Sequence, residues 1–201
     1  MKIAVIGGGG WGTALAALLV KNGHEARLWV YEPDLAERMR RDRVNDRFLP
    51  GVTIPAAVAI TTDLAEAVAD SAMLLFATPS QALRATASRL AHEDHALATA
   101  RLVVIATKGL EQKTYHRMSE VVGETLPLPL GSNPVVLAGP SHAEEVARGI
   151  PTAVVAASRD RTRAAEVQET FSNETFRVYT NDDLLGVEIA VALKNVVAIA
   201  A

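Results

Sequence analysis

The chain opens with an apolar run that leads directly into a cluster of glycines and then into a helix-forming segment. Residues 3–6 read Ile-Ala-Val-Ile, residues 7–12 read Gly-Gly-Gly-Gly-Trp-Gly, and alanine and leucine dominate the next turns. Gly7, Gly9 and Gly12 fit the pattern G-x-G-x-x-G, whose glycines permit a tight turn, close approach of a pyrophosphate, and close packing of helix on strand. The helix N-terminus would then face the phosphates with its free N–H groups and positive dipole end. The sequence therefore predicts a strand, turn and helix that bind a dinucleotide.

A second apolar run, residues 26–31, ends in Tyr31 and is followed by Glu32, which lies 20 positions after Gly12. A carboxylate at this spacing can accept hydrogen bonds from the ribose hydroxyls of NAD. A glycine-rich turn alone could simply connect a strand to a helix, but strand, helix and spaced acid agree here. Because Glu32 lies where the extra phosphate of NADP would sit, and no arginine follows Tyr31, we expect NAD to be preferred over NADP.

Composition narrows the classes of protein that remain. The 201 residues are 49% hydrophobic and 21% charged, with a net charge of −3 and no cysteine. Thiolate chemistry is excluded, the histidines show no metal spacing, and the basic stretch at 38–47 is interrupted by acids, so neither a metal site nor nucleic-acid binding is expected. A signal sequence and an apolar run of about 18 residues are also lacking, so we expect a cytoplasmic protein without a membrane span. The sequence is compatible with a homodimer.

The order of the remaining segments indicates the fold class. Short apolar runs alternate with helical patterns, which is typical of an α/β protein with a Rossmann-type, doubly wound, mostly parallel sheet. The apolar runs are residues 72–77, 102–106, 135–138 and 152–157; the helix candidates are 63–68, 81–90, 115–122, 142–148 and 161–171. Residues 46–55, with two prolines and a glycine, are expected to be an irregular loop.

The last 20 residues differ from the rest, because residues 182–201 are apolar nearly all round, as in a buried helix. We interpret residues 1–181 as the dinucleotide-binding domain and 182–201 as the first helix of an all-α second domain that is otherwise truncated. Lys194 is the exception in this helix. A buried lysine can act as a proton donor or acceptor near neutral pH, or its stem can extend to the surface, and both interpretations remain open.

Polar clusters follow three of the predicted strands, at the edge where open parallel sheets bind ligands. They are residues 78–80, 107–111 and 138–143. Lys108 could attract a phosphate or polarise a carbonyl, or it could be a solvated loop lysine. Ser141, three residues before Glu144, fits a capping box, which would explain it without any ligand.

Several of these segments together resemble the soluble NAD(P)-dependent glycerol-3-phosphate dehydrogenases. The matching motifs are Gly7-Gly8-Gly9-Gly10-Trp11-Gly12-Thr13-Ala14, Asn45-Asp46-Arg47-Phe48-Leu49-Pro50-Gly51, Pro79-Ser80-Gln81, Thr107-Lys108-Gly109-Leu110-Glu111, Ala138-Gly139-Pro140-Ser141, Ala143-Glu144, Pro151-Thr152-Ala153 and Leu193-Lys194-Asn195. The resemblance implies that Trp11, Lys108 and Ala143 contact the dinucleotide, in addition to the glycine turn and Glu32. The expected cofactor-binding residues are therefore Gly7, Gly9, Gly10, Trp11, Gly12, Tyr31, Glu32, Phe48, Lys108 and Ala143. Substrate would be bound by Lys108, Gly139, Ser141 and Lys194, with Lys194 as the catalytic proton acceptor.

The resemblance implies reversible hydride transfer between NAD(P)H and dihydroxyacetone phosphate, which gives sn-glycerol 3-phosphate for glycerophospholipid synthesis. Two positions depart from the family pattern: Gly10 replaces a frequent serine, and Phe48 replaces the usual tyrosine. Without a second domain, we expect residues 1–201 to bind the cofactor but to turn over substrate hardly at all. The alternatives are another two-domain dehydrogenase, of the 6-phosphogluconate or hydroxyacid type, and a non-catalytic NAD-sensing module.

Overall fold

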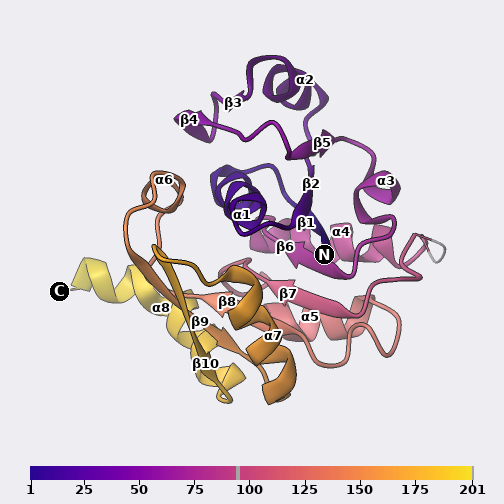
Figure 1. Ribbon diagram of the computed structural model, residues 1–201. Coiled ribbons are helices and arrows are strands. Elements are labelled where there is room, and N and C mark those ends of the chain that lie inside the picture. The colour runs from indigo at the N-terminus through magenta and orange to yellow at the C-terminus, as the bar shows by residue number, and fades with distance from the viewer. Residues whose placement is uncertain (94–95, 201) are drawn as a thin grey trace.

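The computed structural model describes residues 1–93 and 96–200, and among these residues eight strands form one twisted sheet (Figure 1). The strand order is β10-β9-β8-β7-β6-β1-β2-β5, and neighbouring strands are parallel except for the antiparallel pair β8 and β9. The strands are β1 (Lys2–Ile6), β2 (Glu25–Trp29), β5 (Ala59–Thr61), β6 (Met73–Phe76), β7 (Leu102–Ile105), β8 (Val135–Ala138), β9 (Thr152–Ala157) and β10 (Phe176–Asn181). This confirms the predicted mostly parallel sheet.

Helices cover both faces of the sheet, because successive side chains of a buried strand point to opposite faces. In β1, Ile3 and Val5 belong to one hydrophobic cluster, which also contains residues of α1, α2, α6 and α7. Ala4 and Ile6 belong to a second cluster, with residues of α3, α4, α5 and the start of α8. The helices are α1 (Gly10–Lys21), α2 (Pro33–Asp42), α3 (Leu64–Val68), α4 (Ser80–Leu90), α5 (Met118–Thr125), α6 (Ala143–Ala147), α7 (Arg161–Phe171) and α8 (Leu184–Ala200). The doubly wound architecture expected from the sequence is thus confirmed.

The topology creates a crevice between β1 and β6. From β1 the chain moves outward to β2 and β5 on one side, and from β6 it moves outward to β7, β8, β9 and β10 on the other. The connections that follow β1 and β6 therefore leave in opposite directions. Ligands of open parallel sheets bind at this reversal, beyond the carboxyl ends of the strands.

Two of the expected elements differ in the structure. The segment expected to be an irregular loop, residues 46–55, contains a strand, β4 (Leu49–Thr53), which pairs antiparallel with β3 (Val44–Asn45) just before it. The helix expected from residue 115 begins only at Met118, because Lys113 and Tyr115 have φ angles of 72° and 59°, in the left-handed region.

Helix α8 is buried only in its first turns. Leu184 and Glu188 are 8% and 6% exposed, and the helix contacts β8 and β9. Farther along, Val196, Val197 and Ile199 are largely exposed, and the helix extends past the sheet toward the C-terminus (Figure 1). The second half of this apolar helix is therefore not covered by the sheet. Its assignment to a second domain stays a prediction.

In the part of the chain that is described, no helix has both the length and the apolar character needed to cross a bilayer.

Candidate functional site

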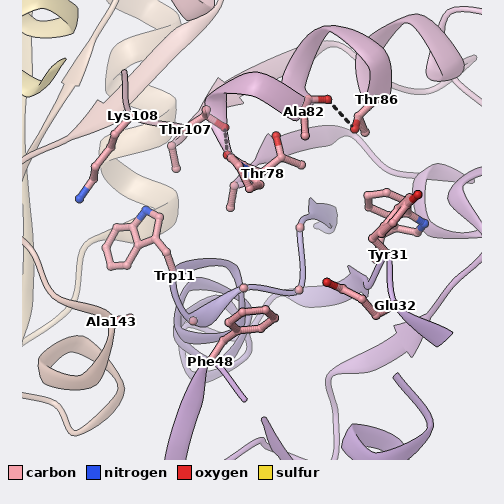
Figure 2. A pocket seen from close by; sticks show the side chains of 18 of the residues that line it. Trp11, Tyr31, Glu32, Phe48, Thr78, Ala82, Thr86, Thr107, Lys108 and Ala143 are labelled. Carbon is pink, nitrogen blue, oxygen red and sulfur yellow. Dashed lines mark hydrogen bonds between the residues drawn. The ribbon is translucent and has the colours of Figure 1, made fainter. Parts of the chain in front are cut away.

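A pocket of about 810 Å³ lies at the carboxyl ends of the central strands, where the crevice was expected. Its walls come from the connections after β1, β2, β6, β7 and β8. The lining residues are Gly7, Gly8, Gly9, Gly10, Trp11, Trp29, Tyr31, Glu32, Phe48, Ala77, Thr78, Pro79, Ala82, Ala85, Thr86, Arg89, Ala106, Thr107, Lys108, Ser141, His142 and Ala143. Figure 2 shows Trp11 and Lys108 at one end of this pocket and Tyr31 and Glu32 at the other. Because these two pairs of residues lie at opposite ends, the pocket can accept an extended ligand.

The glycine turn has the geometry that the sequence pattern predicts. Gly7 has φ of 128°, and a Cβ atom there would lie 2.7 Å from the backbone of Ala77. At Gly12 a Cβ atom would lie 1.9 Å from the carbonyl oxygen of Gly7, so this position serves the close packing of α1 on the turn and does not line the pocket. At Gly9 a Cβ atom would meet no atom within 4 Å. A side chain at position 9 would occupy open space at the pocket, where a phosphate can approach the backbone instead.

The start of α1 leaves backbone donors free for an anion. Gly9 is the N-cap residue and has no side chain to accept from the first turn. The first N–H groups of a helix have no partner within it, so those of the first turn of α1 point toward the pocket with the positive dipole end. The free N–H groups at the start of α1 therefore fit the pyrophosphate of a dinucleotide.

Gly10 is required by the segment that contains Phe48. A Cβ atom at position 10 would lie 2.3 Å from the carbonyl oxygen of Phe48, so a serine cannot be placed here unless the segment moves. Asn45 holds the segment in position: its Nδ2 atom donates to the carbonyl oxygen of Gly8 and to Oγ1 of Thr13, both at 2.9 Å. Its Oδ1 atom accepts from the backbone N–H of Phe48 at 3.0 Å. Asn45 was not predicted to have this supporting role, although it is the polar first residue of the motif at residues 45–51.

The opposite end of the pocket is formed by aromatic and charged groups. Trp29 and Tyr31 meet edge to face with ring centroids 6.0 Å apart, and the guanidinium of Arg89 lies 5.7 Å from the centroid of Trp29. Glu32 lines the pocket, and its Oε1 atom lies 4.0 Å from Nη1 of Arg47. Arg47 does not follow Tyr31 in the sequence, but the β3–β4 connection brings it close to Glu32, which the local sequence does not indicate.

Lys108 is partly buried at the other end, which does not fit a solvated loop lysine. Its ammonium group lies 5.1 Å from the centroid of the Trp11 ring and 3.4 Å from Oγ of Ser141. Burial and, to a smaller degree, the positive charge of Lys194 lower the pKa of Lys108 to about 8. The two lysines, which are 86 positions apart in the sequence, are therefore close enough for their charges to interact.

The turn after β8 differs from its expected capping role. His142 is the N-cap residue of α6 and has extended dihedral angles, φ of −113° and ψ of 137°, so the helix begins at Ala143. The predicted capping box of Ser141 with Glu144 is therefore wrong, and the Ser141 hydroxyl instead accepts from Lys108. Gly139 does not line the pocket; a Cβ atom there would lie 3.0 Å from the carbonyl oxygen of Ala153.

A buried carboxylate fixes the helix that carries Lys194. Glu188 accepts hydrogen bonds from the backbone N–H and the hydroxyl of Ser119, at 2.9 and 2.6 Å, and pairs with Nη1 of Arg117 at 2.9 Å. This anchor was not predicted from the sequence, although an isolated glutamate in an otherwise apolar helix indicates a buried partner.

Comparisons with known proteins agree with this geometry. Residues 2–164 match the family model described as NAD-dependent glycerol-3-phosphate dehydrogenase N-terminus. Curated relatives named glycerol-3-phosphate dehydrogenase [NAD(P)+] are 49% identical in Geobacter metallireducens and 44% identical in Enterococcus faecalis, over all of this chain. A crystal structure of glycerol-3-phosphate dehydrogenase from Coxiella burnetii covers 99% of the chain with a TM-score of 0.89 and 37% identity.

This chain spans only part of those proteins, 58% and 59% of the two curated relatives and 59% of the Coxiella burnetii chain. The matched region nevertheless contains the glycine turn, the strand ends and the pocket described above. The chain belongs to the family of NAD-dependent glycerol-3-phosphate dehydrogenases, over the N-terminal region that the family model describes.

Proposed function

We propose that this chain is the dinucleotide-binding part of an enzyme that transfers a hydride reversibly between NAD(P)H and dihydroxyacetone phosphate, with sn-glycerol 3-phosphate as the reduced product. The observation that carries the proposal is Lys108, whose ammonium group lies against Trp11 and Ser141 in a pocket whose glycine turn fits a pyrophosphate. A module that only sensed NAD would use the glycine turn and Glu32 and would need neither lysine.

The position of each group supports a direction for the cofactor in the pocket. Glu32 and Tyr31 would hold the adenosine ribose, the turn from Gly7 to Gly10 the pyrophosphate, and Trp11, Lys108 and Ala143 the end at which chemistry takes place. Phe48 lies between these ends, where its ring can contact the dinucleotide (Figure 2). A bound NADH or NADPH would supply the hydride.

The lysines would manage the charge that forms on the substrate. As the carbonyl oxygen becomes an alkoxide, Lys194 would donate a proton to it, and Lys108 would stabilise the negative charge. In oxidation Lys194 would accept the proton from the hydroxyl. Ser141 would hold the glycerol phosphate next to Lys108, consistent with the short distance from Lys108 to the Ser141 hydroxyl. Gly139 does not line the pocket, so its expected contact with the substrate finds no support in this geometry.

The decisive experiment compares Lys194→Ala with the unmodified sequence in a full-length enzyme. We expect NADH oxidation by dihydroxyacetone phosphate to fall by about a hundredfold or more, which is typical for loss of a general acid or base. NADH affinity, measured by calorimetry, should stay within about twofold, since the lysine is assigned to proton transfer. Near-normal turnover would contradict this role and leave Lys194 as a lysine that only extends to the surface. The preference for NAD, the cytoplasmic location and the homodimer stay predictions.

A further inference from the structure

The charged pair at the adenosine end of the pocket, Glu32 and Arg47, comes from two separate segments. Glu32 follows β2 and begins α2, and its side chain is one-third exposed at the pocket. Arg47 lies between β3 and β4, with its side chain 55% exposed. Their closest atoms are 4.0 Å apart, which is too long for a hydrogen bond. The guanidinium is therefore near Glu32 without being held by it.

The segment that carries Arg47 is held in place by hydrogen bonds that do not involve its guanidinium. Asn45 ties the segment to the glycine turn through Gly8 and Thr13 and accepts from the N–H of Phe48. The guanidinium of Arg47 lies over the ring of Phe48, 4.9 Å from its centroid. The charge is thus kept beside Glu32 and Phe48, which both line the pocket.

Neighbouring arginines are engaged elsewhere. Arg38 donates to Asp34 and Asp46, Arg41 donates to Asp42, and Arg43 donates to backbone carbonyl oxygens. Among the described residues 38–47, only the guanidinium of Arg47 makes no hydrogen bond to the protein. Its donors are available to a ligand at the position where Glu32 would meet the adenosine ribose.

We propose that Arg47 and Glu32 together discriminate at the 2′ position of the adenosine ribose, and that Arg47 allows this chain to bind NADPH as well as NADH. The proposal rests on the dinucleotide-binding function above and adds the residue that sets cofactor choice. With a 2′-hydroxyl, Glu32 accepts the hydrogen bond and Arg47 balances its charge. With a 2′-phosphate, Arg47 turns from Glu32 to the phosphate oxygens, which a guanidinium can grip with two parallel hydrogen bonds.

The two residues then oppose each other in the binding of NADPH. The Glu32 carboxylate repels a 2′-phosphate, and Arg47 both attracts the phosphate and reduces that repulsion. NADH binding depends little on Arg47, because a ribose hydroxyl carries no charge. The preference between the two cofactors is the difference between their binding free energies. Arg47 changes the binding of NADPH and has little effect on the binding of NADH.

The test is calorimetric titration of the 201-residue chain and its variants with NADH and NADPH. Arg47→Ala should weaken NADPH binding about tenfold or more, the scale of a lost charge-assisted hydrogen bond, and change NADH binding less than about twofold. Glu32→Gln should tighten NADPH binding and narrow the gap between the cofactors. Arg41→Ala is the matched control, because it removes the same charge from the exposed side of α2.

Three results would overturn the proposal. They are an unchanged NADPH-to-NADH affinity ratio in Arg47→Ala, an equal loss of both affinities, and an unmodified chain that binds NADH but no NADPH. An equal loss would show that Arg47 only positions the segment around Phe48. Failure of the unmodified chain to bind either cofactor would instead contradict the proposed function, so the two failures can be distinguished.

Discussion

The Nζ atom of Lys108 lies 3.4 Å from the Oγ atom of Ser141, and this contact joins the connections that follow β7 and β8. Each residue stands at the end of a buried strand, so the rigid sheet sets the distance between them. The lysine proposed to stabilise an alkoxide is therefore held next to the hydroxyl proposed to bind the substrate. Positions fixed in this way need little rearrangement when substrate arrives.

The charge of Lys194 should be measurable through Lys108. We expect Lys194→Met to raise the pKa of Lys108 above its value of about 8, because one of the two causes of the lowered pKa is removed. The pKa should remain below 10.5, since burial is the larger cause and is unchanged. Carbon-13 NMR of reductively methylated lysines would follow the titration, with Lys108→Arg to assign the signal. Lys113→Met is the control, and a pKa of Lys108 unaffected by Lys194→Met would contradict the interaction.

The same lysine predicts how stability depends on pH. The folded chain gives up the Lys108 proton near pH 8, whereas the unfolded chain keeps it to about pH 10.5. Between these values the unfolded state binds more protons, so the free energy of unfolding gains from rising pH. Lys108→Met should therefore be more stable than the unmodified chain at pH 7, and this advantage should shrink as pH rises above about 8. Urea unfolding at several pH values measures this difference in the free energy of unfolding. An advantage of Lys108→Met that increased with pH would contradict the lowered pKa of Lys108.

Asn45 should contribute to both stability and cofactor binding. Asn45→Ala leaves the Gly8 carbonyl oxygen and the Phe48 N–H without their buried partner, at an expected loss of about 2 kcal/mol in the free energy of unfolding. NADH affinity should fall too, since the segment would no longer be tied to the glycine turn. Urea unfolding and calorimetry test both effects. Asn133→Ala, at an exposed position, should change neither.

Glu188 should control how firmly α8 is held against the sheet. Glu188→Ala removes the partner of a buried ion pair, so we expect a loss of about 3 kcal/mol in the free energy of unfolding. Amide hydrogen exchange in α8 should accelerate more than in α7. The exposed Glu169 gives the control, since Glu169→Ala should have an effect within about 0.5 kcal/mol. Uniform acceleration in both helices would show that Glu188 stabilises the whole domain and not α8 in particular.

The sequence predicted the central strands well because their burial leaves a simple pattern. β6, β7 and β8 are buried at every position and read as continuous apolar runs. The edge strands were missed: β10 buries only Phe176 and Val178, and β5 has three residues. An edge strand has one exposed face or little length, so its composition resembles that of a loop.

The candidate site was only partly predictable for a different reason. The glycine turn, Glu32 and Lys108 follow strands directly, so local sequence indicates where they lie. Asn45, Arg47 and Glu188 act through partners that are distant in the sequence, such as Gly8 at 37 positions and Ser119 at 69. No local periodicity contains such pairings. For Ser141 the local sequence was misleading. Its neighbours fit the pattern of a helix cap, but His142 has an extended backbone, so α6 begins only at Ala143.

The two tryptophans of the chain lie at opposite ends of the pocket, Trp11 against the ammonium of Lys108 and Trp29 beside Tyr31. The pocket thus has an intrinsic fluorophore at each end. In the orientation proposed above, a reduced nicotinamide near Trp11 would accept its excitation energy, and the emission of Trp29 would respond to the adenine. The order in which the two halves of a dinucleotide settle can consequently be followed by stopped-flow emission in Trp11→Phe and Trp29→Phe variants, without any attached dye.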